Sequence, residues 1–205
     1  MMDNDNFYCL AQQLIEAGRF INSQGWVPAT SGNFSARLAD GSIAITVSGK
    51  HKGHLQISDI MLVDAHANAL DGKKPSAEAV LHTSIYQRCP DAQAVLHPHS
   101  PNAILVSRLF TDEIILEGYE LLKAFKGITS HESRISIPIF ANDQDIPRLA
   151  RQVEQYMDRH GEIVAYIIAG HGLYTWATSV AETLRYLEAL DHLFNYELRL
   201  KGIRP

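Results

Sequence analysis

Two histidines separated by one residue, His97 and His99, carry the strongest chemical signal in the sequence. The apolar run over 92–96 predicts a short strand that ends where these histidines begin. Side chains two positions apart on a strand point to the same side, so both imidazoles can reach one metal ion. Pro98 stiffens the chain between them and removes one backbone donor. The alternative is that both are exposed loop histidines without a ligand.

A third histidine, His171, follows the apolar run VAYIIAG and lies between Gly170 and Gly172. Taken alone, this motif is simply a tight turn made by two glycines. Taken with the first motif, it places three histidines at the ends of two buried strands, which is the ligand set of a catalytic zinc ion with one open position. Imidazole also binds iron, nickel, copper and cobalt, so the pattern does not select the metal.

Two short polar loops, Thr30-Ser31-Gly32-Asn33 and Ser48-Gly49-Lys50, are candidates for binding an anion. Each contains a glycine, lies next to a predicted strand and offers hydroxyl and backbone N–H donors, as anion-binding nests do. The chain has neither the GxxxxGK[ST] nor the GxGxxG phosphate motif. Either loop alone would be interpreted as an ordinary turn.

The segment Pro75-Ser76-Ala77-Glu78 opens a predicted helix that leads to the first histidine motif. Ser76 is a suitable N-cap, and Glu78 in the first turn either complements the helix dipole or contributes a carboxylate to the site.

Hydrophobic periodicity predicts the elements that position these motifs. Helices are expected over 6–23, 76–88, 101–110, 118–125 and 146–159, and from Ser179, with Glu182 as its capping-box partner. Strands are expected over 34–38, 43–47, 60–63, 92–96, 135–140, 164–169 and 173–176. The connections are too irregular for repeated βαβ units, so we expect an α/β fold with a mixed or largely antiparallel sheet.

Composition excludes several classes of function. The 205 residues carry 18 basic and 23 acidic side chains, a net charge of -5, which gives no electrostatic footprint for nucleic acid or anionic membrane. The two cysteines do not form a disulfide framework, and no apolar run reaches the roughly 18 residues that cross a bilayer. The first residues lack the features of a signal peptide, so we expect a cytoplasmic protein.

Taken in chain order, the motifs closely resemble those of the class II aldolase/adducin family: a TxGN loop, an SG loop, a PSxE turn, an HxH strand end and a GHG strand end. The resemblance covers nearly the whole chain. It implies one class II aldolase-like domain over 1–205, with a central, mainly antiparallel sheet between helical layers, and assembly as a homotetramer. It implies one Zn²⁺ per subunit on His97, His99 and His171. It also implies that a small sugar-phosphate substrate places its phosphate on Thr30, Gly32, Asn33, Ser48, Gly49 and Ser76.

Two features are similar to the branch of that family that dehydrates 5-methylthioribulose 1-phosphate to 2,3-diketo-5-methylthiopentyl 1-phosphate in methionine salvage. One is the segment HGLYTWATS over 171–179. The other is Glu120 in GYELLK, where this branch carries its acid/base glutamate, on a short helix that we expect to face the site. The SGKHKG loop over 48–53 is more basic than the branch pattern.

Two other functions remain open from the sequence. A sugar-phosphate aldolase or 4-epimerase of the same family would use the same metal and phosphate sites, with Glu78 as the aldolase base. A non-catalytic binding module, like the adducin head, is the alternative from another class, and the complete histidine set argues against it.

Overall fold

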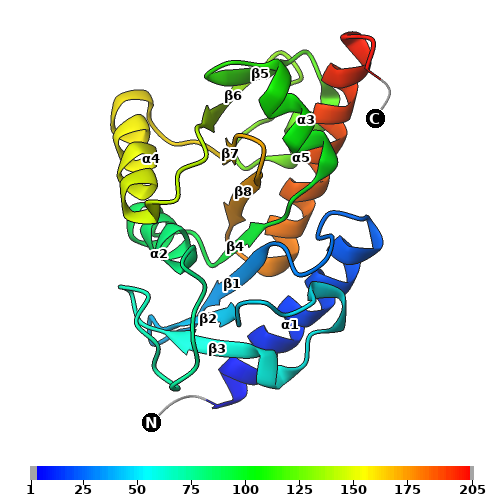
Figure 1. Cartoon of the computed structure of the whole chain (residues 1–205). Helices are drawn as coiled ribbons and strands as arrows, with labels where there is room; N and C mark the ends of the chain where they lie inside the picture. Colours follow the sequence, from blue (N-terminus) through cyan, green and yellow to red (C-terminus); the bar gives the residue numbers. More distant parts are fainter. Residues whose placement is uncertain (1–3, 204–205) are drawn as a thin grey trace.

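A computed structural model of the chain describes residues 4–203. The helices of this part are α1 (Asn4–Ser23), α2 (Ala79–Arg88), α3 (Pro101–Leu109), α4 (Ile146–His160) and α5 (Val180–Leu200). The strands are β1 (Asn33–Arg37), β2 (Ile43–Thr46), β3 (Ile60–Val63), β4 (Ala94–His97), β5 (Glu113–Glu117), β6 (Arg134–Phe140), β7 (Ala165–Ile168) and β8 (Gly172–Ala177) (Figure 1). Short 3-10 helices are η1 (Lys52–His54), η2 (Ile57–Asp59) and η3 (Glu120–Ala124).

The strands form one sheet in the order β3-β2-β1-β4-β8-β7-β6-β5. All neighbouring strands are antiparallel except β6 and β7. The expectation of a mixed, largely antiparallel sheet in an α/β protein is therefore confirmed. The order brings the end of β4 beside the start of β8, so that His97 and His171 come close although more than 70 residues separate them.

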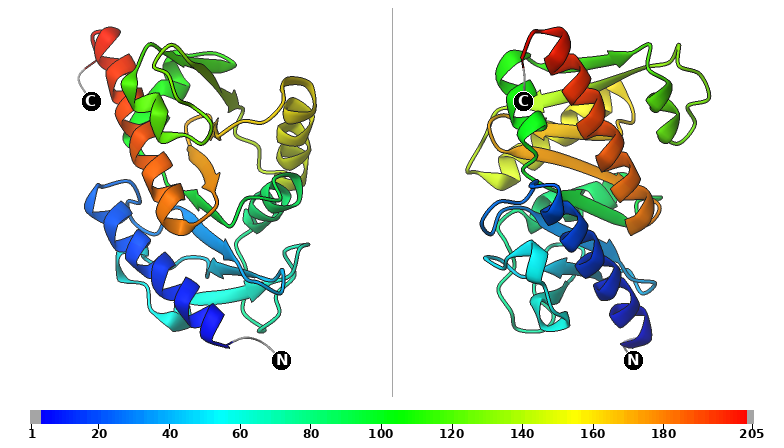
Figure 2. Two further views of the ribbon diagram at one scale, coloured as in Figure 1. Left: turned by 180° about the vertical axis from the view of Figure 1, so that it is seen from behind. Right: turned by 90° about the vertical axis from the view of Figure 1, so that its right-hand side faces the viewer.

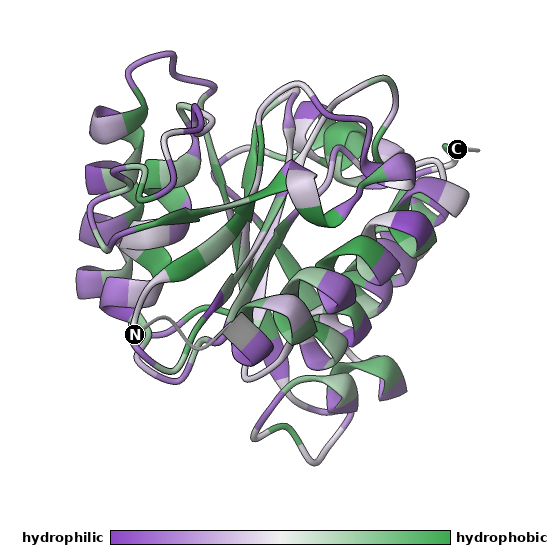
Figure 3. Ribbon diagram, turned by 90° about the horizontal axis from the view of Figure 1, so that it is seen from below, coloured by the Kyte–Doolittle hydropathy of each residue, from purple (hydrophilic) through white to green (hydrophobic). Residues whose placement is uncertain are grey.

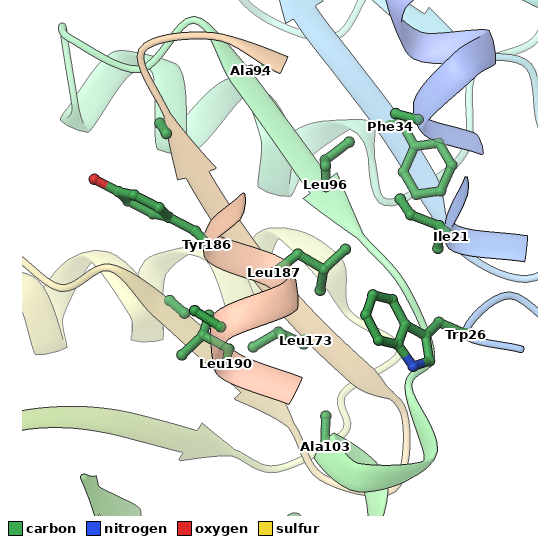
Figure 4. Close-up of a cluster of buried hydrophobic side chains, with 14 of the residues drawn as sticks. Ile21, Trp26, Phe34, Ala94, Leu96, Ala103, Leu173, Tyr186, Leu187 and Leu190 are labelled. Atoms are coloured by element: carbon green, nitrogen blue, oxygen red, sulfur yellow. The ribbon is translucent and has the colours of Figure 1, made fainter. Parts of the chain in front are cut away.

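Helices cover both faces of the sheet (Figures 1 and 2). Helices α1, α3 and α5 lie over one face, and α2 and α4 lie over the other. Alternate residues of each strand supply the two cores, because successive side chains on a strand point to opposite faces. Figure 4 shows the first core, where Leu187 and Leu190 of α5 face Leu96 of β4 and Leu173 of β8. Figure 3 shows the outer surfaces of the helices to be mainly hydrophilic.

The start of α5 differs slightly from the predicted capping box. Ser179 is the N-cap, and its hydroxyl accepts a hydrogen bond from the backbone N–H of Glu182. The Glu182 carboxylate, however, accepts from the backbone N–H of Thr178 at 3.2 Å rather than from that of Ser179. The helix therefore begins at the expected place with a modified cap.

Helix α2 begins three residues later than expected. The hydroxyl of Ser76 accepts from the N–H of Glu78 at 3.3 Å, which makes a turn that precedes the helix. Helical hydrogen bonding starts at Ala79, and Glu78 occupies the N-cap position without capping the helix through its side chain. Its carboxylate is consequently available to the neighbouring strands.

Strand β5 is absent from the strands that the sequence predicts. It forms a hairpin with β6, in which Glu113 pairs with Pro138 and Glu117 with Arg134. Its burial pattern is exposed at both ends with Ile114 and Leu116 buried, so only a few residues carry the alternation.

None of the helices in residues 4–203 combines the length and apolar character needed to cross a membrane.

Candidate active site

Three histidine side chains meet at one end of the sheet. The Nε2 atom of His97 lies 3.1 Å from Nε2 of His99 and 3.4 Å from Nε2 of His171. One ligand atom from each of the three residues lies within 4.8 Å of the other two. His97 is fully buried, whereas His99 and His171 are partly exposed, so the cluster is reached from one side. The structure thus brings together all three histidines that the sequence singles out.

The backbone of β8 fixes the orientation of the His97 ring. The Nδ1 atom of His97 lies 2.9 Å from the carbonyl oxygen of Leu173, and the N–H of Leu173 in turn donates to the carbonyl of Pro98. A carbonyl can only accept, so Nδ1 carries the proton in the neutral ring and Nε2 presents a lone pair. The ring is also stacked on Tyr174, with centroids 3.9 Å apart.

A tight turn between β7 and β8 delivers the third histidine. The N–H of His171 donates to the carbonyl of Ile168 at 3.0 Å, which closes a four-residue turn. Its third residue, Gly170, has a φ of 67°, a conformation that side-chain-bearing residues rarely adopt. The turn therefore needs the first glycine of the GHG motif.

The second glycine of that motif, Gly172, is needed because the backbone approaches the other histidines closely. A Cβ atom at Gly172 would lie 2.4 Å from the carbonyl oxygen of Pro98 and 2.9 Å from Cε1 of His97. The first contact is with backbone, so it is not relieved by a side-chain rotation. Each glycine therefore has a separate reason to be present.

Gly172→Ala should displace β8 from the His97 loop and weaken metal binding, with a loss of about 1–3 kcal/mol in stability, typical of overpacking. Metal content after purification and the thermal unfolding midpoint would measure both effects. Gly170→Ala is the matched control, because a Cβ there meets nothing within 4 Å and only the turn is strained. Full metal content in Gly172→Ala would contradict this account.

The donor set fits one tetrahedral metal ion. Two nitrogens that each lie about 2.05 Å from a zinc ion at a tetrahedral angle are about 3.4 Å apart. The spacings from His97 to its two neighbours, 3.1 and 3.4 Å, are close to this separation, and all three ligand atoms lie within 4.8 Å of one another. The Nε2 lone pair of His97 faces both neighbouring rings, as it would if the three imidazoles shared one cation. The cluster can therefore hold one divalent ion and leave a coordination position free.

Burial keeps the two histidines of the HxH motif neutral. Burial lowers the pKa of His97 well below its usual value, and the charges of His99 and His171 lower it further. Burial likewise lowers the pKa of His99 to about 4, with His171 and Lys52 acting in the same direction. Metal binding requires unprotonated imidazole, so these shifts favour binding at neutral pH.

The Glu78 carboxylate lies against the histidine cluster. Its Oε1 is 3.2 Å from Nε2 of His171, and its Oε2 is 3.8 Å from Nε2 of His97. The amide nitrogen of Asn33 donates to Oε2 at 2.5 Å. The side chain is 16% exposed, so the carboxylate is within reach of a ligand bound at the cluster.

A cavity of about 170 Å³ adjoins the cluster. It contains all six residues predicted to bind phosphate, together with Glu78 and His99. Its complete lining is Thr30, Ser31, Gly32, Asn33, Thr46, Val47, Ser48, Gly49, Ser76, Glu78 and His99. The hydroxyl of Ser31 is buried and has no hydrogen-bond partner within residues 4–203, so it is free to donate to a ligand. A larger cavity, of about 440 Å³ beside Trp176 and Lys126, contains none of the three histidines.

The buried side chain of Lys52 links the two polar loops of this cavity by hydrogen bonds to their backbone. Its Nζ donates to the carbonyl of Thr30 at 2.9 Å and to the carbonyl of Lys50 at 2.6 Å. The side chain is 1% exposed and contacts no carboxylate in the described part of the chain. Burial lowers its pKa to about 8, against the opposing effect of Glu78. No sequence pattern signals this role, since a lysine in a basic loop is normally exposed, as Lys50 is beside Asp59.

Glu120 is not brought to the histidines within one protomer. It begins η3, where Leu122 is buried in the core beneath α5, on the face of the sheet opposite the core of α2 and α4. The Glu120 side chain is 74% exposed, and its carboxylate accepts from Lys123 at 2.6 Å, which lowers its pKa. The expected short helix is present, but it does not face the site of its own chain, and the catalytic role of Glu120 stays a prediction.

Relatives of known name match the chain over nearly its full length. It is 62% identical over 203 residues to the methylthioribulose-1-phosphate dehydratase of Methylococcus capsulatus, a match that covers 99% of this chain and 100% of the relative. It is 50% identical over 196 residues to the enzyme of the same name from Pseudomonas fluorescens, covering 95% of this chain and 94% of the relative.

Solved structures share the fold at much lower identity. YgbL from Klebsiella pneumoniae superimposes with a TM-score of 0.81 at 21% identity, over 97% of this chain and 94% of YgbL. L-fuculose-1-phosphate aldolase from Thermus thermophilus gives 0.77 at 23% identity, over 95% and 96% of the two chains. The sequence model of the class II aldolase and adducin N-terminal domain matches residues 12–198. The chain therefore belongs to the class II aldolase and adducin N-terminal domain family.

Proposed function

We propose that the protein is a zinc-dependent lyase that dehydrates 5-methylthioribulose 1-phosphate to 2,3-diketo-5-methylthiopentyl 1-phosphate, a step of methionine salvage in the cytoplasm. The relatives at 62% and 50% identity carry the name of this dehydratase. The observation that carries the proposal is that the histidine cluster and the polar loops line one cavity. His99 of the histidine cluster and Glu78 line the same cavity as the polar loops, so a phosphate and a reacting carbonyl of one small molecule fit side by side.

The reaction needs a carbonyl that is activated next to the carbon that loses a proton. Zinc bound by His97, His99 and His171 would polarise the C2 carbonyl as a Lewis acid, which makes the C3 proton acidic. A carboxylate removes that proton and an acid protonates the departing C4 hydroxyl. Loss of water leaves an enol, which becomes the diketone by proton transfer to carbon. No lysine Schiff base is required.

The polar cavity accounts for binding of the phosphate. Hydroxyls of Thr30, Ser31, Ser48 and Ser76 and backbone N–H groups of the glycine-containing loops are the donors that suit its oxygens. Lys52 supplies positive charge from behind the loops while holding both of them in place. The affinity of the cavity for a doubly charged anion follows from these donors and this charge together.

Glu120 is the acid/base in this proposal, and it acts at the metal centre of a neighbouring subunit. Within its own protomer its side chain is 74% exposed and does not line the cavity beside the histidines. In a symmetric homotetramer every copy contributes the same interface surface. A carboxylate that is exposed in the single subunit can therefore lie at the cavity of the neighbouring subunit. A glutamate enclosed by such an interface is desolvated, which moves its pKa towards the neutral range suited to proton transfer.

The second candidate function is a sugar-phosphate aldolase or 4-epimerase. The observation that favours it is the position of Glu78, whose carboxylate lies 3.2 Å from His171. An aldolase would use this carboxylate as its base and would not need Glu120. The two functions therefore differ in which glutamate is essential and in which bond of the substrate breaks.

Product analysis separates the two functions. Purified protein loaded with zinc should convert 5-methylthioribulose 1-phosphate to the diketone, detected by mass as the loss of one water. Fuculose 1-phosphate should remain uncleaved under the same conditions. Cleavage of fuculose 1-phosphate without dehydration of the first compound would replace the dehydratase by the aldolase.

Ser48→Ala and Ser76→Ala should each raise KM by about tenfold or more, because a hydrogen bond to a charged group contributes about 1.5–3 kcal/mol. The phosphate is bound equally in the ground and transition states, so kcat should change much less. Steady-state kinetics on 5-methylthioribulose 1-phosphate measure both constants, with the exposed Ser23→Ala as control. An unchanged KM in both variants would show that the phosphate does not bind in this cavity.

A further inference from the structure

A second buried histidine, His82, connects the core beneath α2 with the active site. It is fully buried, and both of its ring nitrogens have partners. Its Nδ1 lies 2.7 Å from the hydroxyl oxygen of Ser35, and its Nε2 contacts the amide oxygen of Asn33. The Ser35 hydroxyl also lies 2.8 Å from that of Tyr86. No sequence motif distinguishes His82 from an ordinary structural or surface histidine, and its two bonded nitrogens show the first of these environments.

The hydrogen bonds run in one direction and end on the Glu78 carboxylate. The Asn33 amide nitrogen donates to Glu78, so its amide oxygen faces His82 and accepts the proton on Nε2. Nδ1 of the neutral ring then accepts from Ser35, whose oxygen accepts from Tyr86. Burial lowers the pKa of His82 to about 3, so the ring stays neutral with one N–H. The chain in order is Tyr86, Ser35, His82, Asn33 and Glu78.

The spacing of these residues explains why they meet. Glu78, His82 and Tyr86 are each four residues apart, which places them on one face of α2. Asn33 and Ser35 are two residues apart on β1 and point to the same face of the sheet. Asn33 is also the register partner of His97 across β1 and β4. One helix face and one strand face therefore form a continuous path from the core to the metal ligands.

We propose that His82 is a positioning residue that acts through Asn33 to hold the Glu78 carboxylate beside the histidine metal centre. The role in turnover rests on the proposed function, whereas the role in metal binding rests on the histidine cluster alone. Asn33 is the hydrogen-bond donor that fixes Oε2 of Glu78, and His82 prevents its amide from turning over, since a flipped amide would point two donors at each other. Asn33 is thus a link between core and site as well as a wall of the cavity.

The first test compares two variants of His82. His82→Phe keeps the ring and removes both nitrogens, whereas His82→Gln keeps a donor near the position of Nε2. Outer partners of metal sites typically contribute 10–100-fold in metal affinity or activity. We expect His82→Phe to lower metal affinity and kcat by at least tenfold, with KM changed less than about threefold. His82→Gln should recover part of both losses.

Ser84→Ala is the matched control on the same helix. Its hydroxyl donates to Glu154 of α4 at 2.6 Å, away from the path to Glu78. It should leave metal affinity and kcat within about twofold of wild type. Metal affinity equal to wild type in folded His82→Phe would overturn the proposal, as would equal losses in His82→Phe and Ser84→Ala. If His82→Phe does not fold, His82→Gln and Asn33→Ala carry the test.

A double-mutant cycle then tests whether the effect passes through Asn33. Metal affinity is measured by chelator competition on resting protein without substrate, for Asn33→Ala, His82→Phe and the combination. If His82 acts through Asn33, the second substitution adds little to the first, whereas additive losses would overturn the proposal. This readout needs no turnover, so it stands even if the wild-type protein fails to dehydrate 5-methylthioribulose 1-phosphate, a failure that would count only against the proposed function.

Discussion

Each of the substitutions His97→Ala, His99→Ala and His171→Ala should remove the metal and lower the rate of dehydration by about 10³-fold or more. A Lewis acid contributes several kcal/mol to such a reaction, and each 1.36 kcal/mol is a factor of ten in rate. Loss of one ligand leaves two imidazoles, which is one fewer than catalytic zinc sites use. The effect should appear in kcat and in metal content together.

His97→Ala should be the most damaging of the three to the protein itself. Its ring is fully buried, donates to the carbonyl of Leu173 and is stacked on Tyr174. Removal leaves that carbonyl without its side-chain donor and opens a cavity beside the tyrosine. His171→Ala, with its partly exposed side chain, gives the cleaner measurement of metal binding alone.

Metal content is measured on protein purified without added metal, and the same measurement identifies the ion. The exposed His66→Ala serves as control and should keep both metal and activity. Circular dichroism confirms that each variant is folded. Full metal occupancy in His171→Ala would reject the assignment of that residue as a ligand.

Glu120→Gln should lower kcat by about 10²–10⁴-fold, the usual loss of a general acid/base, while metal content and the thermal midpoint stay near wild type. The substitution keeps the shape of the side chain and removes only the proton acceptor. If Glu120 serves merely as the surface partner of Lys123, the rate should hardly change, since exposed ion pairs contribute little. Turnover above a tenth of the wild-type rate would therefore exclude the catalytic role.

Two further glutamates make the comparison specific. Glu117→Gln, at an exposed position beside Arg134, should be neutral. Glu78→Gln should lower kcat less than Glu120→Gln in a dehydratase and more in an aldolase. The ratio of the two losses thus reports on the reaction as well as on the residues.

Mixing inactive subunits tests whether Glu120 reaches a neighbour's metal. When His171→Ala and Glu120→Gln proteins are refolded together, about a quarter of the sites in randomly mixed tetramers would combine intact histidines with an intact Glu120. Activity should then return from two inactive proteins. If mixed tetramers recover no activity, Glu120 does not act at the metal centre of a neighbouring subunit.

The parts of the site that follow strand periodicity could be predicted from the sequence. His97 and His99 lie two apart at the end of β4, and His171 follows β7 in a turn that requires Gly170. Local patterns suffice here because strand ends and glycine turns are local properties of the chain. The polar loops around Gly32 and Gly49 could be found for the same reason.

The features of the site that could not be predicted depend on packing between segments that are far apart in the sequence. Lys52 lies in a basic loop that is normally exposed, and by sequence His82 is either a surface or a structural histidine. In the structure η1 packs under α1 and α2 packs over β1, so both side chains are enclosed. The distance from Glu120 to the histidines depends on how η3 packs on α5, which no spacing along the chain indicates. Strand β5 could not be found because only two of its residues are fully buried.

The buried position of Lys52 has a consequence for how the cavity responds to its surroundings. At 0.1 M ionic strength, salt largely screens interactions between exposed charges that are more than about 10 Å apart, but it screens the interactions of enclosed charges much less. The ammonium of Lys52 is covered by the same loop backbone that it supports, at 1% exposure. Counter-ions therefore cannot compete for it directly, and the attraction of this cavity for an anion depends less on ionic strength than that of an exposed lysine would.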